Sequence, residues 1–162
     1  MWLPLAFGGC GEDSSSEDLA AGEPAELAGI TEAHNALRSE VSVPPLRWNA
    51  ALAELAAGFV QDCEFAHSSG QERSNVAGFS YVGENLFMSS YAPTGKQVSD
   101  AWGSEKQNYD AATGDCSGVC GHYTQQVWRT TTDLGCAIKQ CPSGYIVSCE
   151  YGPGGNSGGK AF

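Results

Sequence analysis

The sequence predicts one mixed α+β domain that is held together by disulfide bonds. The chain has 162 residues, 41% of them hydrophobic, and a chain of this length buries roughly 70% of its unfolded surface around a single core. Segments with helical and strand periodicity alternate along it. Six of the seven cysteines lie among these segments. An even set without paired Cys-x-x-Cys spacing favours disulfides over a metal site.

The N-terminal region differs from the rest of the chain. Residues 1–10 are apolar and end in two glycines and Cys10. They resemble the end of a bacterial lipoprotein signal, in which Cys10 would carry the lipid; the alternative is a signal-peptide remnant with an incidental thiol. Residues 11–26 are acidic and rich in Ser and Gly, so we expect a disordered tether. No apolar run approaches the roughly 20 residues that span a bilayer.

Two helices are expected at the start of the domain. The first has apolar residues at steps of three and four and ends before Pro44 and Pro45. Its inner side carries Leu27, Ile30, His34, Leu37 and Val41. Asn49 is a plausible N-cap of the second helix. The inner side of that helix carries Leu52, Leu55, Ala56, Phe59 and Cys63.

A strand, a third helix and a hairpin are expected to follow. Residues 82–88 form the strand, and residues 123–128 form a short helical turn. The third helix starts near Thr94, and one face of it carries Val98, Ala101, Trp102, Glu105 and Tyr109. The sequence Cys-Pro-Ser-Gly at 141–144 has the chemistry of a type I turn and joins strands at 134–140 and 145–151. Residues 158–162 are expected to be loose.

The hairpin restricts the cysteine pairing. Cys136 and Cys149 stand opposite each other about the turn, within bridging reach. Cys116 and Cys120 are close enough to staple one loop, which leaves Cys63 with Cys141. The alternative is a set of six reduced buried thiols, which would suit a cytosolic protein. The disulfides favour an exported one.

The charge of the chain excludes some classes of partner. The chain has eight Lys and Arg residues and nineteen Asp and Glu residues, which gives a formal net charge of −11. No basic stripe can neutralise a row of phosphates, so nucleic-acid binding is excluded. Attraction to anionic lipid headgroups is disfavoured for the same reason.

Glu105 is the residue that first suggests a site, because a charge on an apolar helix face needs a partner. The chain has three histidines that could pair with it. His34 shares an apolar stripe and is interpreted as a hydrogen-bonded core residue. His67 and His122 remain, but periodicity alone does not bring either of them to Glu105.

Several motifs resemble those of the CAP superfamily, which comprises cysteine-rich secretory proteins, antigen 5 and plant pathogenesis-related proteins. Residues 121–128 (Gly-His-Tyr-Thr-Gln-Gln-Val-Trp) are similar to the first family signature, and residues 146–156 are similar to the second. The segments at 34–38, 46–49, 83–86 and 102–105 fall in the family's order. The resemblance covers residues 28–157 and is nearest to the plant branch in cysteine placement. Gln126 and Glu150 depart from the family pattern.

The resemblance implies a three-layer α-β-α sandwich over residues 27–157, with a small antiparallel sheet between helices. It also implies a cleft lined by His67, Glu84, Glu105 and His122. Two neutral imidazoles can ligate Zn²⁺ or another divalent cation, with the carboxylates as orienting groups or further ligands. The alternative is a satisfied polar network that only ties the helices to the sheet.

The sequence therefore predicts a monomeric protein, secreted or anchored at the cell surface, that binds a lipid, a sterol or a protein partner rather than catalysing a reaction. The apolar residues considered for such contacts are Phe79, Tyr81, Phe87, Tyr91, Val127 and Trp128. The alternative function is a metal-assisted, peptidase-like hydrolase with Glu84 or Glu105 as general base. No His-Glu-x-x-His or Gly-x-Ser-x-Gly motif supports it. A third hypothesis is a structural protein that displays its acidic surface.

Overall fold

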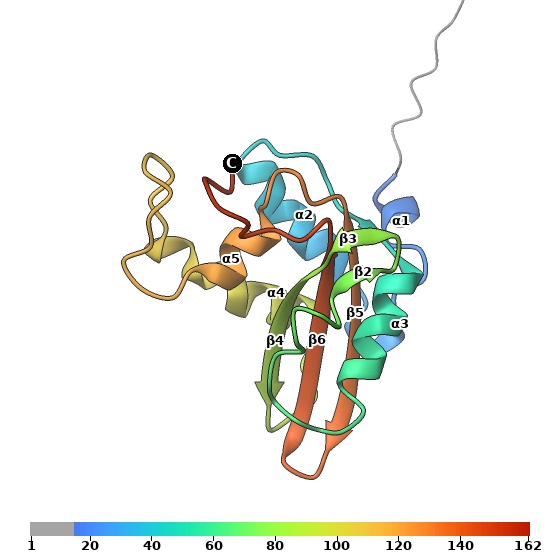
Figure 1. Ribbon diagram of the computed structural model, residues 1–162. Helices are drawn as coiled ribbons and strands as arrows, with labels where there is room; N and C mark the ends of the chain where they lie inside the picture. The colour runs from blue at the N-terminus through green and yellow to red at the C-terminus, as the bar shows by residue number, and fades with distance from the viewer. Residues whose placement is uncertain (1–14) are drawn as a thin grey trace, which may run out of the picture.

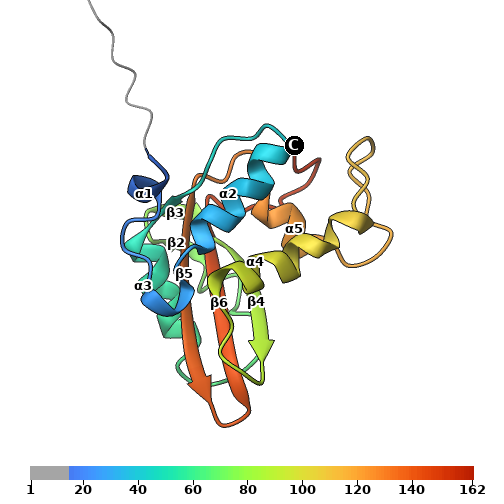
Figure 2. The same cartoon turned by 180° about the vertical axis from the view of Figure 1, so that it is seen from behind.

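A central sheet lies between two helical layers in the computed structural model, which describes residues 15–162. Helix α3 (Ala50–Phe59) covers one face, as Figure 1 shows. Helices α2 (Ile30–Glu40) and α4 (Gly95–Gly103) cover the other, with α5 (Gly121–Gln126) beside them (Figure 2). The three-layer sandwich expected from the family resemblance is confirmed.

The sheet has four strands in the order β1-β5-β6-β4, with β1 parallel to β5 and the other pairs antiparallel. The predicted hairpin is present, and Cys141 faces Gly144 at its turn. Two short strands form a separate hairpin that was not predicted. The strands are β1 (Arg47–Trp48), β2 (Ser74–Val76), β3 (Phe79–Tyr81), β4 (Gly83–Ser89), β5 (Asp133–Cys141) and β6 (Gly144–Gly152).

Local capping sets where two of the helices begin. The Asn49 side chain accepts from the backbone N–H groups of Ala51 and Leu52, at 3.0 and 3.2 Å, as an N-cap does. Thr94 and Gln97 form a reciprocal capping box at the start of α4. Helix α3 ends at Phe59, so Cys63, expected on its inner side, lies beyond it in a turn.

The third helix is shorter than its apolar pattern predicts. Helix α4 ends at Gly103, and Glu105 belongs to a 3-10 helix, η2 (Ser104–Asn108). The Ser104 hydroxyl donates to the Ala101 carbonyl at 2.7 Å, a local bond that competes with continued α-helix. Ala101, expected on the apolar face, is exposed, and Tyr109 follows the helical segment. The 3-10 turn re-aims Glu105 toward α5.

Each face of the sheet has its own apolar core. The larger core joins α2 and α4 to the sheet and includes Ile30, Trp102 and Val147. The smaller joins Ala56 of α3, and Val60 directly after that helix, to the opposite face. Disulfides connect Cys63 with Cys141, Cys116 with Cys120, and Cys136 with Cys149, and these are the pairs that the sequence predicts.

Both ends of the described chain are more ordered than expected. The segment expected to be a tether, residues 11–26, contains α1 (Ser16–Leu19) and the start of the 3-10 helix η1 (Ala25–Leu27). The Glu23 carboxylate accepts from the backbone N–H groups of Gly29 and Thr31, at 2.8 and 2.7 Å, where α2 begins. The tail, expected to be loose, places Ala161 in contact with Tyr109 and buries it. Cys10 lies outside the described residues.

No helix in the described part of the chain is both long enough and apolar enough to cross a membrane.

Candidate functional site

One half of the site is formed by His67 and Glu84. His67 lies in the loop after α3, and its Nδ1 is 2.5 Å from Glu84 Oε1 on β4. Glu84 also accepts from the backbone N–H of Ser68 at 3.1 Å and from its hydroxyl at 2.7 Å. The Glu84 side chain is 1% exposed and that of His67 is 57% exposed. A buried carboxylate thus holds an accessible imidazole.

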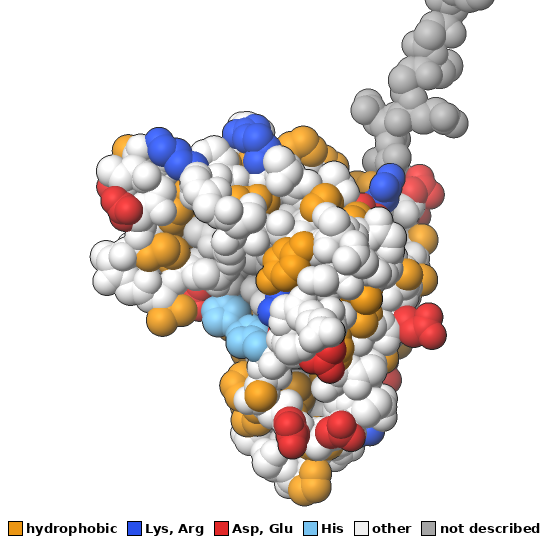
Figure 3. All heavy atoms as spheres, in the orientation of Figure 1, with side chains coloured by type: hydrophobic (Ala, Val, Ile, Leu, Met, Phe, Trp, Pro, Cys, Tyr) orange, Lys and Arg blue, Asp and Glu red, His pale blue; other side chains and the backbone are white. Residues whose placement is uncertain are grey.

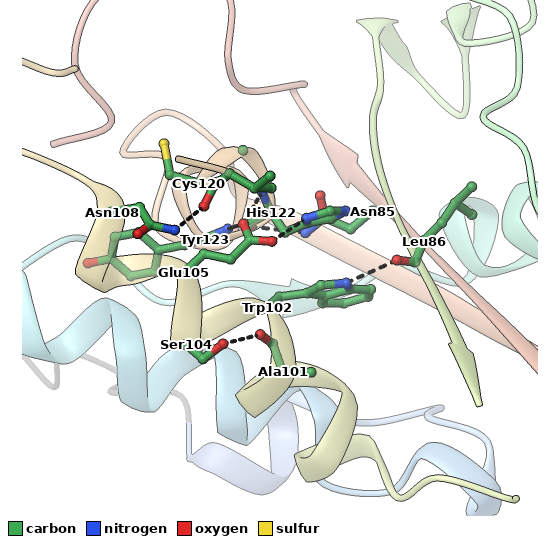
Figure 4. Close-up of polar contacts among 12 residues, drawn as sticks. Asn85, Leu86, Ala101, Trp102, Ser104, Glu105, Asn108, Cys120, His122 and Tyr123 are labelled. Atoms are coloured by element: carbon green, nitrogen blue, oxygen red, sulfur yellow. Dashed lines mark hydrogen bonds and ion pairs between the residues drawn. The ribbon is translucent and has the colours of Figure 1, made fainter. Parts of the chain in front are cut away.

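The other half is formed by His122 and Glu105 (Figure 4). His122 is the second residue of α5, and its Nδ1 is 2.7 Å from Glu105 Oε1. Glu105 Oε2 accepts from the backbone N–H groups of His122 and Tyr123, at 3.0 and 3.3 Å. These N–H groups have no partner within the helix, so Glu105 both orients the imidazole and caps α5.

Aromatic stacking and one amide fix the position of His122. Its ring stacks on Trp102, with centroids 6.1 Å apart and planes inclined by 5°. Trp102 Nε1 donates to the carbonyl of Leu86 on β4. Asn85 Nδ2 donates to the His122 carbonyl at 3.1 Å. Because Glu84 and Asn85 are successive on one strand, they point to opposite faces of the sheet. The edge strand β4 therefore supports both halves.

The hydrogen bonds fix which nitrogen of each imidazole is free. An ionised carboxylate only accepts, so each Nδ1 carries the proton and each Nε2 keeps its lone pair when the ring is neutral. The His122 side chain is 29% exposed, and Figure 3 shows histidine side chains exposed in an indentation of the surface. Each imidazole therefore presents an accessible nitrogen lone pair, which is the group through which histidine ligates a divalent cation such as Zn²⁺.

The four residues are arranged as two pairs rather than as one set of four ligands. Within residues 15–162, no three His, Cys, Asp or Glu side chains gather closely enough to hold a metal together. The carboxylate oxygens of Glu84 and Glu105 are already occupied by hydrogen bonds. The geometry favours an orienting role for both carboxylates over a role as further ligands.

His34 is a core residue, as the sequence predicts. Its Nδ1 is 2.8 Å from the carbonyl of Ile30, and its Nε2 is 2.8 Å from the hydroxyl of Tyr151. Asn85 also donates to that hydroxyl, which links His34 to the site. Complete burial lowers the pKa of His34 to about 4, with the Arg38 charge acting in the same direction.

Sequence reasoning missed three residues that support the site. Ser68 donates to Glu84, Asn85 donates to the His122 carbonyl, and Glu150 lies beside Glu84 on the next strand. Ser68 directly follows His67, and Asn85 directly follows Glu84 within the segment at 83–86, so adjacency to site residues could have suggested both. In the sequence, Glu150 stands out only as a departure from the family pattern, because no periodicity relates β4 to β6.

The apolar residues considered for ligand contacts divide by exposure. Val127 and Trp128 belong to a buried cluster and are core residues. Tyr81 and Tyr91 are exposed, by 39% and 68%. Phe79 and Phe87 are half-buried.

Comparison with known proteins identifies the family. Residues 31–151 match the family described as "CAP: Cysteine-rich secretory protein family". Pathogenesis-related protein 1 of Arabidopsis thaliana is 41% identical over 129 residues, which are 76% of this chain and 74% of that protein. Mouse glioma pathogenesis-related protein 1 is 40% identical over 130 residues, 76% of this chain, but the match spans only 51% of that longer protein.

Solved structures share the fold. Schistosoma mansoni venom allergen-like protein 4 superposes with a TM-score of 0.71 and 28% identity, covering 82% of this chain and 91% of that one. NaASP2, solved with Zn²⁺, gives a TM-score of 0.70 and 29% identity and covers 86% of both chains. The chain therefore belongs to the CAP family of cysteine-rich secretory proteins.

Proposed function

We propose that this domain is an exported binding module whose cleft holds a divalent cation, zinc in the first instance, through Nε2 of His67 and Nε2 of His122. The observation that carries the proposal is the engagement of both Nδ1 atoms by carboxylates, which leaves both Nε2 atoms as ligands. The NaASP2 relative solved with Zn²⁺ supports it. Three disulfides support export to an oxidising compartment.

The hydrogen bonds that Glu84 and Glu105 already accept favour binding over hydrolysis. A general base needs an oxygen that can take a proton from water. Glu84 already accepts from His67 and Ser68, and Glu105 from His122 and Tyr123. Each of the four carboxylate oxygens therefore already accepts a hydrogen bond, and a catalytic water would have to compete with these donors. Two protein ligands would leave the remaining positions of a bound cation to water or to a partner's side chain.

Calorimetric titration with Zn²⁺ tests the cation site. His67→Ala and His122→Ala each remove a ligand and are expected to abolish measurable binding. Glu105→Gln keeps the size of the side chain but loses the charge that orients His122, and it should weaken binding about 10- to 100-fold. Glu64→Gln, at an exposed carboxylate in the His67 loop, is the matched control. Unchanged affinity in both histidine variants would refute the proposal.

The hydrolase alternative has a separate assay. A mixed peptide pool is incubated with the protein, with and without zinc. We expect no cleavage above that of the Glu105→Gln variant. Zinc-dependent cleavage that Glu105→Gln abolishes would favour the hydrolase.

A groove beside α3 favours a lipid or sterol as the second candidate ligand. A cavity of about 370 Å³, with a mainly apolar lining, includes Trp48, Ala57 and Ile138. Delipidated protein should take up labelled sterol or fatty acid saturably. Uptake should persist in His67→Ala but fall in Ala57→Trp, which fills the groove, whereas Glu54→Gln at the rim is the control. If neither ligand class binds, this candidate is excluded.

Anchoring at the cell surface through Cys10 is a further part of the proposal, and mass spectrometry of the native protein tests it. A mass increase equal to an acylated cysteine at residue 10 is the expected result. An unmodified N-terminal peptide would exclude the anchor and favour a protein that is secreted without one.

A further inference from the structure

Glu150 lies directly behind the His67–Glu84 pair. It is the cross-strand partner of Glu84 on β6, so the two side chains lie on the same face of the sheet. Glu150 is 0% exposed and the Glu84 side chain is 1% exposed. Its neighbour on β5 is Gly135, and the backbone of α3 packs on that glycine so closely that a methyl group would collide with it. Two carboxyl groups therefore share one site that water does not reach.

The surrounding donors decide which of the two carries the negative charge. Glu84 accepts from His67 Nδ1 and from the N–H and hydroxyl of Ser68. Glu150 accepts from one donor, the Ser148 hydroxyl, on Oε1 at 2.7 Å. Its other oxygen, Oε2, is buried and has no hydrogen-bond partner when Glu150 is written as a carboxylate. Two adjacent buried carboxylates repel, so a proton on Glu150 resolves both the repulsion and the unpartnered oxygen.

The electrostatics of the pocket agree with this assignment. Burial, followed by the charge of Glu84, raises the pKa of Glu150 to about 8. The Ser148 hydrogen bond and the Arg73 charge act in the opposite direction and are smaller. The Arg73 guanidinium donates to the carbonyls of Ser68 and Val82 and to the Tyr81 hydroxyl.

We propose that Glu150 is a positioning residue of the His67 half of the site: it stays a neutral carboxylic acid whose O–H donates to Glu84 and so holds that carboxylate against His67 Nδ1. The Ser148 hydroxyl supports Glu150, Glu150 supports Glu84, and Glu84 fixes the proton of His67 on Nδ1. Glu84 and Glu150 are directly opposite each other on neighbouring strands, where the Cβ atoms of such a pair lie about 4.5–5.5 Å apart. In the other half, backbone N–H groups support Glu105 instead, so His122 is an internal control.

Any effect of Glu150 on cation binding through His67 rests on the proposed function. The test below uses metal-free protein, so the role of Glu150 and the proposed cation site can fail separately. Ring nitrogen-15 NMR reports the tautomer of each histidine. Glu150→Gln keeps a neutral donor at the position of the acid and should preserve the Nδ1–H tautomer of His67. Glu150→Met removes the donor and should raise the Nε2–H population of His67 about tenfold, the effect of losing one hydrogen bond to a charged group.

His122 should keep its tautomer in both variants. An unchanged His67 tautomer in Glu150→Met, or an equal change in both histidines, would overturn the proposal. Infrared spectroscopy of the wild-type protein keeps the test valid if Glu150→Met does not fold. The carbonyl band of a protonated carboxylic acid should be present at neutral pH and missing in Glu150→Gln. Its absence from the wild-type protein would also overturn the proposal.

Discussion

Replacing His34 with glutamine should make the stability of the domain less sensitive to acid. His34 is 0% exposed, and burial lowers its pKa from 6.5 to about 4. In the unfolded chain the imidazole takes up a proton near pH 6.5, whereas the folded protein keeps it neutral until about pH 4. The stability that depends on neutral His34 is therefore complete above pH 6.5 and is lost progressively as the pH falls toward 4.

The size of the effect follows from the two pKa values. At pH 5 the unfolded chain is about 1.5 pH units below its histidine pKa, while folded His34 is still mostly neutral. At about 1.4 kcal/mol per pH unit, the wild-type protein loses about 2 kcal/mol of unfolding free energy between pH 7 and pH 5. Glutamine does not titrate, so His34→Gln escapes this loss. The fixed cost of changing the hydrogen bonds to Ile30 and Tyr151 is the same at both pH values.

Denaturant unfolding of both proteins at pH 7 and pH 5 measures the difference. The gap in unfolding free energy between the wild type and His34→Gln should shrink by about 2 kcal/mol on acidification, or about 4–8 °C in Tm for a domain of this size. Titration of Glu150 is common to both proteins and cancels. A gap of the same size at both pH values would refute the reasoning, because it would mean that His34 is protonated equally in the folded and unfolded states.

Three further predictions concern stability. Glu150→Gln should stabilise the domain at pH 7 by up to about 3 kcal/mol and have no such effect at pH 4. The reason is that the raised pKa of Glu150 makes the wild type lose stability as the pH rises from 4.5 through about 8. Unfolding curves that show no pH-dependent difference between the two proteins would contradict this prediction. Asn49→Ala should cost about 1 kcal/mol through loss of the N-cap of α3, and Asn49→Ser should recover it; equal stability of the two variants by thermal unfolding would rule out capping. Replacing both Cys136 and Cys149 by serine should lower the unfolding free energy by about 3 kcal/mol. An unchanged midpoint of denaturant unfolding would show that this disulfide contributes nothing to stability.

The features predicted correctly are those that short-range chemistry controls. Asn49 caps α3 because its side chain reaches backbone N–H groups two and three residues ahead. The turn at 141–144 fixes the register of β5 and β6, and with it the juxtaposition of Cys136 and Cys149. The core position of His34 follows from the apolar stripe in which the residue lies. Each of these interactions is visible in a window of a few residues.

The errors occur where distant segments compete with a local pattern. The apolar face of the third helix continues to Tyr109, yet the helix ends at Gly103 and Glu105 turns to cap α5. The acidic segment before Leu27 was predicted to be disordered, but Glu23 finds the free N–H groups at the start of α2. The glycine-rich tail is ordered by its contact with Tyr109.

The roles of the two residues that depart from the family pattern also depend on distant segments of the chain. Gln126 and Glu150 are both 0% exposed, and each has one side-chain oxygen without a partner. Gln126 joins α5 to Ser99 of α4. Neither residue type would be expected in a core, and the sequence offers no reason for them. Their roles depend on which residues lie opposite.

The amino-acid sequence by itself determined the disulfide framework, the principal helices and the hairpin, and its resemblance to the family indicated the four residues of the candidate site. The tertiary structure decided how those four residues are used: as two imidazole–carboxylate pairs on either side of β4, with a third buried carboxyl behind one pair. The reason is physical. Periodicity and capping act over a few residues along the chain, whereas hydrogen bonding and the charge state of a buried carboxyl are set by whatever the fold places within about 3 Å of it.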